Sequence, residues 1–283
     1  MCVKITIFEP MKTIDTSVII STYNSPTWLQ KVLWSFDKQT YDNFEVVIAD
    51  DGSGLETKTL IEAMKTEVSY PIQHIWHEDN GFQKTIILNT ATVAAKGNYL
   101  VYTDGDCLAR ADFLQVHINR REAGYFLSGG YFKLPMDISE LISEEEIKTQ
   151  GCFNIDWLTS HGLKSSFKNN KITAKGLKQK LLNLITPTTA TWNGHNASGY
   201  KKDIIAANGY DERMQYGGED RELGERLFNA GIKAKQVRYS AICLHLDHER
   251  GYVKPEMIEI NLKIRATTKQ QKVIKTPFGI EKF

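Results

Sequence analysis

Two acidic pairs are the residues of this sequence best suited to do chemistry. Asp104 and Asp106 are separated by one residue and directly follow an apolar run. Carboxylates at that spacing can face a hard cation, which prefers oxygen ligands and keeps positions open for phosphate. An aspartate-rich turn is the structural alternative, because aspartate and glycine are favoured in turns anyway.

The second pair, Glu219 and Asp220, follows Gly217 and Gly218 at the predicted start of a helix. Acidic residues in the first turn of a helix are favoured by its dipole, so the motif could be only a good helix start. The two glycines, however, let the backbone approach a ligand closely, with both carboxylates directed into one cleft. The chain has no G-x-G-x-x-G and no G-x-x-x-x-G-K-[ST] motif, which argues against a Rossmann dinucleotide site and a P-loop.

The elements that must position these pairs alternate between two types through the first half of the chain. Short apolar runs predict strands at 16–22, 44–49, 72–76 and 98–103. Amphipathic spacing predicts helices at 25–38, 55–67 and 82–96, the last ending at Gly97 as a C-cap. This alternation predicts an α/β fold with a mostly parallel central sheet and helices on both faces.

Polar clusters stand at three of the predicted strand ends, at 22–24, 50–53 and 104–106. Ligands of such sheets bind beyond the carboxyl ends of the strands, so the clusters should converge on one rim. At 50–53, Asp50 could accept a hydrogen bond from a base or ribose, or the cluster could be only a turn with a helix N-cap.

The rest of the chain is less regular. Residues 135–187 are rich in Lys, Glu and Asn, and we expect an inserted helical or partly mobile segment there. Beyond it we expect helices at 201–207, 217–229 and 255–269, and strands at 235–238 and 241–245. The pattern shows no repeats.

Composition limits the classes of function. The chain has 283 residues, with 35 Lys and Arg against 34 Asp and Glu, so nothing draws it generally to nucleic acid or to an anionic membrane. The four cysteines are scattered, which fits a reducing cytosol. Neither a signal peptide nor an apolar run of membrane-spanning length is present, so we expect a cytoplasmic protein that is at most peripheral at the inner face of the membrane.

The order of the motifs resembles the family-2 glycosyltransferases of the GT-A fold. The matching segments are 21–24, 39–41, 50–53, 79–82, Asn89, 95–99 and 104–106. Two later segments, 208–211 and 217–220, resemble the C-terminal half of β-1,4-galactosyltransferases and bacterial chondroitin polymerases. The resemblance covers residues 15–133 and 189–250, and the segment 135–188 has no counterpart that we can name.

This resemblance implies one GT-A domain over residues 1–283. Residues 15–133 would form its nucleotide-binding half, 135–188 a variable insertion, 189–250 the acceptor and catalytic half, and 255–283 a C-terminal helix and tail. On the donor side, Thr22, Tyr23 and Asp50 would line the uracil and ribose pocket, with Asp104 near the ribose and the metal. Lys84 could contact a phosphate or be an ordinary solvated lysine.

The resemblance also implies a divalent metal. Asp106 would be its principal ligand, and His245 matches the histidine that galactosyltransferase-type members place on a late strand. An imidazole together with a carboxylate suits Mn²⁺ better than Mg²⁺. His248 lacks the family match and is the less favoured ligand.

On the acceptor side, Asp220 would be the catalytic base, and Glu219 with Gly218 would bind the acceptor or the donor sugar. Trp192 and Asn193 lie where related enzymes hold the donor sugar. A core tryptophan capping a strand is an equally good interpretation of Trp192. Tyr216 stands where the family usually has tryptophan, which leaves the acceptor open.

We therefore expect an inverting transfer from a UDP-sugar to a glycan or lipid-linked glycan, in bacterial surface polysaccharide or lipopolysaccharide synthesis, with no nucleic-acid partner. One alternative is a non-catalytic protein that binds sugar nucleotides or glycans on the same scaffold. A sugar-phosphate nucleotidylyltransferase is another, but residues 21–26 lack the glycine-rich, basic loop that it would need.

Overall fold

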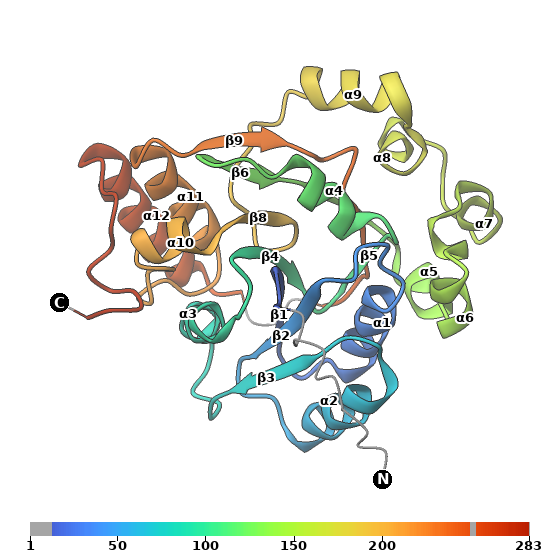
Figure 1. Cartoon of the computed structure of the whole chain (residues 1–283), viewed down its shortest axis with the longest axis horizontal. Helices are drawn as coiled ribbons and strands as arrows, with labels where there is room; N and C mark the ends of the chain where they lie inside the picture. Colours follow the sequence, from blue (N-terminus) through green and yellow to red (C-terminus); the bar gives the residue numbers. More distant parts are fainter. Residues whose placement is uncertain (1–12, 250–252, 283) are drawn as a thin grey trace, which may run out of the picture.

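A seven-stranded sheet forms the centre of the computed structural model, which describes residues 13–249 and 253–282. The strand order is β3-β2-β1-β4-β8-β6-β9 (Figure 1). These strands are β1 (Thr16–Thr22), β2 (Phe44–Asp50), β3 (Ile72–Trp76), β4 (Tyr99–Asp104), β6 (Tyr125–Ser128), β8 (Ala197–Tyr200) and β9 (Lys233–Gln236). All neighbouring strands pair in parallel except where β8 joins β4 and β6. The predicted, mostly parallel sheet is confirmed.

Both faces of this sheet are covered, which explains why the central strands β1 and β4 are buried along almost their whole length. Alternate residues of β1 enter different cores: Val18 and Ile20 belong to one buried cluster and Ile19 to the other. The first core is closed by α1 (Pro26–Phe36) and α2 (Leu55–Glu67). The second is closed by α3 (Lys84–Ala94), α10 (Lys201–Ala206) and α11 (Glu219–Asn229), and α12 (Pro255–Gln270) packs against α11.

The helix expected over 82–96, with Gly97 as its C-cap, ends two residues earlier, at Ala94. Gly97 has a different role, because an added Cβ would lie only 2.5 Å from the backbone nitrogen of Ser17. The glycine thus lets the chain enter β4 in close contact with β1. Its own N–H donates to Oγ of Ser17 at 2.9 Å.

A second, three-stranded sheet combines the strand predicted at 241–245 with two short strands that the sequence left unassigned. It consists of β5 (Cys107–Ala109), β10 (Ile242–His245) and β7 (Gly130–Lys133), with α4 (Phe113–Arg120) between β5 and β6. Within it, His245 pairs with Cys107, so the late strand is placed directly beside the Asp104–Asp106 loop. In addition, Leu246 N–H donates to the carbonyl oxygen of Asp106 at 2.9 Å.

The inserted segment is helical, as expected. It contains α5 (Met136–Leu141), α6 (Glu144–Lys148), α7 (Ile155–Ser160), α8 (Asn170–Thr173) and α9 (Gly176–Ile185), with 3₁₀ turns at Gly151–Phe153 and Phe167–Asn169. These helices follow one another along one side of the molecule (Figure 1). The first ones supply Ile138, Ile147 and Leu158 to the core, whereas α9 buries little. In the described parts of the chain, no helix has the length and apolar character needed to cross a membrane.

Candidate active site

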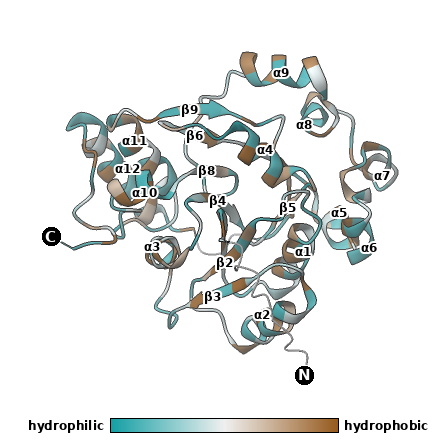
Figure 2. Ribbon diagram, viewed as in Figure 1, coloured by the Kyte–Doolittle hydropathy of each residue, from teal (hydrophilic) through white to brown (hydrophobic). Residues whose placement is uncertain are grey.

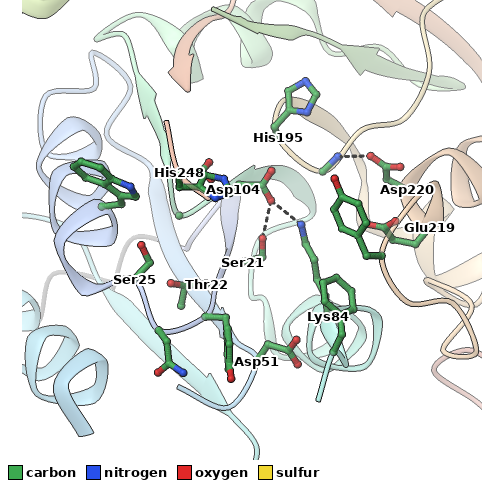
Figure 3. Close-up of a pocket in the computed structure, with 18 of the residues that line it drawn as sticks. Ser21, Thr22, Ser25, Asp51, Lys84, Asp104, His195, Glu219, Asp220 and His248 are labelled. Carbon is green, nitrogen blue, oxygen red and sulfur yellow. Dashed lines mark hydrogen bonds and ion pairs between the residues drawn. The ribbon is translucent and has the colours of Figure 1, made fainter. Parts of the chain in front are cut away.

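A cleft of about 800 Å³ opens beyond the carboxyl ends of β1, β2 and β4. Its walls come from the loops after these strands, from the loop before α3, and from the start of α11 (Figure 3). Residues from both halves of the sequence meet there. They include Ser21, Thr22, Tyr23, Asp51, Phe82, Lys84, Asp104, Asp106, Tyr131, His195, Tyr216, Glu219, Asp220, His245 and His248.

The three strand-end loops are joined by hydrogen bonds. Asp51 N–H donates to the carbonyl oxygen of Thr22 at 3.0 Å, and Gly105 N–H donates to that of Ser21 at 2.8 Å. Asn24 N–H donates to Oγ of Ser53 at 2.8 Å. Because these contacts cross between neighbouring strands, the polar ends form one fixed rim. The predicted convergence of the three clusters is confirmed.

A fourth loop, residues 77–83, packs onto this rim at Gly52. The φ of Gly52 is +91°, and an added Cβ would lie 2.6 Å from Cα of Asp79, so a larger residue would displace the loop. Nε2 of His77 lies 2.9 Å from Oδ1 of Asp51, and Gln83 N–H donates to Oδ2 of Asp51 at 3.1 Å. Burial raises the pKa of Asp51 despite these contacts.

Thr22 and Tyr23 line the cleft where the sequence placed the nucleotide. The Tyr23 hydroxyl donates to Oδ2 of Asp79 at 2.9 Å. Oγ1 of Thr22 is buried and has no hydrogen-bond partner among the described residues. The prediction that Asp50 lines the nucleotide pocket is wrong, since its side chain is fully buried behind the cleft. Its carboxylate contacts Nε2 of His74 at 2.9 Å and accepts from Ser53 N–H, so the lining carboxylate is its neighbour, Asp51.

Lys84 and Asp104 form an ion pair at the centre of the cleft, with Nζ 2.8 Å from Oδ1 (Figure 3). The same oxygen accepts from Oγ of Ser21 at 2.7 Å. Burial alone would raise the pKa of Asp104, but the adjacent ammonium overrides it and holds that pKa well below its usual range. Burial would likewise lower the pKa of Lys84, but the carboxylates of Asp104 and Glu219 raise it. Lys84 is therefore a fixed cation rather than a solvated surface lysine.

Asp106, His245 and His248 form a cluster whose ligand atoms all lie within 4.8 Å of one another. Oδ2 of Asp106 is 2.9 Å from Nε2 of His248 and 3.7 Å from Nε2 of His245. Nδ1 of His245 lies 2.7 Å from the carbonyl oxygen of Leu246, and Nδ1 of His248 lies 2.8 Å from that of Glu249.

These carbonyl contacts determine the tautomers of the two histidines. A carbonyl oxygen can only accept, so each Nδ1 carries a proton. Nε2 of His248 lies 2.9 Å from Oδ2 of Asp106, which also only accepts, so without a cation this nitrogen donates to the carboxylate. A divalent cation would instead take the Nε2 lone pairs and the carboxylate, which together are the donor set of a transition-metal site. The residues present fit such an ion. His248, which the sequence disfavoured, lies closer to Asp106 than His245 does.

Glu219 and Asp220 begin α11 on the opposite wall of the cleft. Asp220 accepts from the N–H groups of Gly194 at 3.0 Å and Arg221 at 2.7 Å, so its carboxylate has a fixed orientation. Glu219 accepts from Gly217 N–H at 2.9 Å. Burial raises the pKa of both carboxyl groups, and the charge of Asp220 raises that of Glu219 further.

One glycine and one asparagine support this wall without lining the cleft. Gly218, with φ +93°, is the N-cap of α11 and packs beside the side chain of Arg265. Asn193 is buried, and its Oδ1 accepts from Asn196 N–H at 2.8 Å. Neither residue lines the cleft, whereas Gly194 does. The structure gives Gly218 and Asn193 positions next to the site and not in it.

Of the two interpretations of Trp192, the core tryptophan is the one that the structure bears out, and the sugar platform is not. Its side chain is fully buried, and Nε1–H donates to the hydroxyl of Tyr210 at 3.0 Å. The rings of Tyr102 and Phe126 pack on it at centroid distances of 5.4 and 5.6 Å. The indole is part of the second core because these aromatic neighbours enclose it, so no face remains for a ligand.

Sequence reasoning missed Tyr131 and gave His195 no role, although the structure brings both to the cleft. Tyr131 comes from β7, a strand that was not predicted, and its ring lies 4.7 Å from that of His195 and 4.9 Å from that of His245. Burial lowers the pKa of His195 to about 4. The aromatic wall that Trp192 does not supply comes from Tyr216 and Phe82, whose ring centroids are 6.0 Å apart. A His-x-x-His spacing was the one sequence signal for His248.

Two families of known proteins match this chain. Residues 17–186, more than half of the chain, match the family described as glycosyl transferase family 2. The chain belongs to glycosyl transferase family 2. Residues 188–249 match the family described as the N-terminal domain of galactosyltransferase. The first match extends through the inserted segment, for which the sequence had suggested no counterpart.

The similar proteins are larger. The chain is 25% identical to the chondroitin synthase of Escherichia coli over 243 residues, which cover 78% of this chain and 33% of that protein. It thus spans about a third of that relative's length. Among solved structures, S. aureus TarS 1–349 with UDP-GlcNAc superimposes with a TM-score of 0.58 at 16% identity, covering 91% of this chain and 69% of that one.

A second solved structure is the mannosyltransferase PcManGT from Pyrobaculum calidifontis in complex with GDP-Man and Mn²⁺. It superimposes with a TM-score of 0.55 at 16% identity, covering 91% of this chain and 62% of that one. At such identities the likeness shows the fold, and the predicted GT-A fold is confirmed.

Proposed function

We propose that this chain is an inverting glycosyltransferase that moves a sugar from a UDP-sugar to an acceptor hydroxyl. The observation that carries the proposal is the arrangement of charge in one cleft. On one wall, carboxylates lie beside Lys84 and two histidines. On the other, burial outweighs the charge of Lys84 and raises the pKa values of Glu219 and Asp220. A donor with a charged diphosphate and an acceptor that must lose a proton need these two environments.

The donor side follows from the fixed rim. We assign the uracil and ribose to Thr22, Tyr23 and Asp51, and the diphosphate to the neighbourhood of Lys84, which stays charged at any physiological pH. Support for a uridine nucleotide comes from the TarS complex with UDP-GlcNAc, whereas PcManGT binds GDP-Man. The base preference is therefore part of what must be tested.

Asp106, His245 and His248 would hold a divalent cation, which when bound supplies positive charge next to the leaving diphosphate. Mn²⁺ suits two imidazoles and a carboxylate better than Mg²⁺ does, and PcManGT is described with Mn²⁺.

Asp220 is the proposed general base. The two N–H groups that it accepts from orient its carboxylate, and burial raises its pKa, which makes the carboxylate more basic. As the acceptor oxygen forms its bond to the anomeric carbon, the bond from that carbon to the diphosphate oxygen breaks. The acceptor proton passes to Asp220 and UDP leaves, so the anomeric configuration inverts. Glu219 and the rings of Tyr216 and Phe82 would bind the sugars.

The acceptor we propose is a glycan or a lipid-linked glycan of a bacterial surface polysaccharide, in line with the similarity to chondroitin synthase. The test is UDP or GDP release from a panel of nucleotide sugars, with Mn²⁺, with Mg²⁺ and with chelator. We expect slow, Mn²⁺-dependent release of UDP from one sugar, accelerated by the right acceptor. Binding of a nucleotide sugar without release under any condition would instead indicate a non-catalytic binding protein.

A further inference from the structure

A strongly basic segment lies in the inserted region, and none of its residues lines the cleft. Residues 163–185 contain six lysines, at 164, 168, 171, 175, 178 and 180, and no Asp or Glu. All of these lysines are exposed except Lys171. The chain as a whole has a net charge of only +1, so the positive charge is concentrated in this one segment.

The same segment exposes large apolar side chains on α9. Leu177, Leu181, Leu184 and Ile185 follow the spacing i, i+4, i+7 and i+8, which places them on one face of the helix. This leucine face points into solvent: the side chains of Leu177 and Leu184 are each 83% exposed. Leu182, on the other side of the helix, is buried against Tyr239.

The lysines border the leucine face. At 100° per residue, Lys178 lies beside one edge of it and Lys180 beside the other. Phe167, in the preceding turn, adds a ring that is 71% exposed. In Figure 2, apolar and polar residues alternate along α9 at the outer edge of the molecule.

Contacts from the inner side hold α9 in this orientation. Asn183 Nδ2 donates to Oγ of Ser240 at 2.8 Å, and Tyr239 N–H donates to Oδ1 of Asn183 at 2.9 Å. Nζ of Lys171 donates to the carbonyl oxygen of Tyr131 at 2.8 Å. The exposure of the leucine face is therefore built into the fold, and Lys171 connects the segment to a strand that lines the cleft.

We propose that the leucine face and its bordering lysines bind the surface of a bilayer that contains anionic phospholipid. A helix with an aliphatic face, lysines along its edges and no acidic residue has the composition of helices that lie in a membrane interface. The aliphatic side chains enter the boundary between headgroups and acyl chains, while the lysine stems extend along it and their ammonium groups reach lipid phosphates.

A second copy of the chain is the weaker occupant, because two such faces would bring like charges together in the contact. Membrane binding goes beyond the proposed function, since it needs neither donor nor metal. Its consequence for transfer, that the cleft is held near acceptors carried on lipid, does rest on the proposed function.

The experiment is co-sedimentation of the full chain with phosphatidylcholine vesicles that contain increasing fractions of phosphatidylglycerol. We expect binding that rises with the phosphatidylglycerol fraction and falls with added salt. The double variant Leu177→Ser/Leu184→Ser should weaken partitioning about ten-fold or more. Lys178→Gln/Lys180→Gln should weaken it by about five-fold for each lysine removed. These positions are exposed, so the variants should fold.

Matched controls change exposed leucine and lysine side chains outside residues 163–185. Leu262→Ser on α12, where the leucine is 55% exposed, and Lys58→Gln/Lys96→Gln should leave partitioning unchanged. All variants should release UDP from soluble donor at the rate of the unmodified chain, which keeps a failed proposal here distinct from a failed assignment of the cleft. Vesicle binding that is absent, or equal in the α9 variants and the controls, would overturn the proposal. So would a monodisperse dimer that Leu177→Ser/Leu184→Ser converts to monomer.

Discussion

The two acidic pairs of the cleft lie on facing walls, yet their surroundings are opposite. Asp104 and Asp106 are next to cations or groups that can become cationic: Lys84, His245 and His248. Glu219 and Asp220 accept hydrogen bonds from backbone N–H groups, and burial outweighs the charge of Lys84, which would lower both pKa values. The pKa of Asp104 is lowered and those of the second pair are raised. The comparison shows that carboxyl groups are kept ionised on one wall, whereas on the other their raised pKa values suit them to accept a proton.

The largest effect should come from removing the proposed base. Asp220→Asn keeps the shape and most hydrogen bonds but cannot accept a proton, so the turnover number should fall about 10²–10⁴-fold. The control Asp203→Asn changes a partly buried aspartate on α10 outside the cleft and should have little effect. Steady-state rates with saturating donor and acceptor make the measurement. Near-normal turnover in Asp220→Asn would mean that the acidic pair only stabilises the first turn of α11 and takes no part in catalysis.

The metal ligands should give the next largest effect. Since Nε2 of His248 is closer to Asp106 than Nε2 of His245 is, His248→Ala should weaken Mn²⁺ binding at least as much as His245→Ala. We expect a loss of about 10–100-fold in each. Titrating Mn²⁺ and following the free ion by electron paramagnetic resonance checks this. An unchanged affinity in His248→Ala, with a loss in His245→Ala, would restore the ligand set expected from the sequence.

A third prediction uses the opposite pKa shifts. Ionised Asp104 stabilises the fold, and this contribution is present above the ordinary carboxylate pKa and lost as pH falls through the lowered folded value. Ionised Glu219 costs stability, and this cost appears as pH rises through its raised folded value. At pH 8 without metal, Asp104→Asn should therefore destabilise the protein by about 1.5–3 kcal/mol.

Glu219→Gln should instead stabilise it, by about 1.4 kcal/mol for each unit of pKa difference removed. Both effects should shrink as the pH is lowered. Melting temperatures of the two variants at pH 8 and in acid test the signs. A shift in the same direction at pH 8 would mean that the two walls do not differ electrostatically.

The smallest functional effect should come from Trp192. Because the indole is enclosed in the core, Trp192→Phe should cost stability, on the order of 1–3 kcal/mol, while the KM for donor stays the same. Chemical denaturation and donor kinetics on the same variant separate the two. A raised KM for donor in a Trp192→Phe variant of normal stability would indicate that Trp192 binds the sugar after all.

The sequence predicted the first half of the fold well, because buried parallel strands are uniformly apolar and amphipathic helices have a clear period. The bounds of α2 and β3 were predicted to the residue. It failed where tertiary context decides. β5 and β7 are short strands that pair with β10, more than a hundred residues away, and no local pattern announces them.

The site was predicted in part for the same reason. A motif tells which carboxylates stand at a strand end, but not which of two neighbours faces the cleft. Asp50 points into the protein and Asp51 lines the cleft, although either could have been chosen. Trp192 shows the converse limit, because the aromatic neighbours that bury it come from distant strands. Which of His245 and His248 lies closer to Asp106 likewise became clear only from the distances in the structure.

The most direct test of the difference between the two walls is a calorimetric titration of UDP with Mn²⁺ into Asp106→Ala and Asp220→Asn, side by side. Asp106→Ala removes the carboxylate of the metal cluster, whereas Asp220→Asn leaves that cluster and Lys84 intact. We predict that UDP binding is abolished in the first variant and unchanged in the second. Equal losses of affinity in the two variants, or unchanged binding in Asp106→Ala, would contradict the division of the cleft into a donor wall and a base wall.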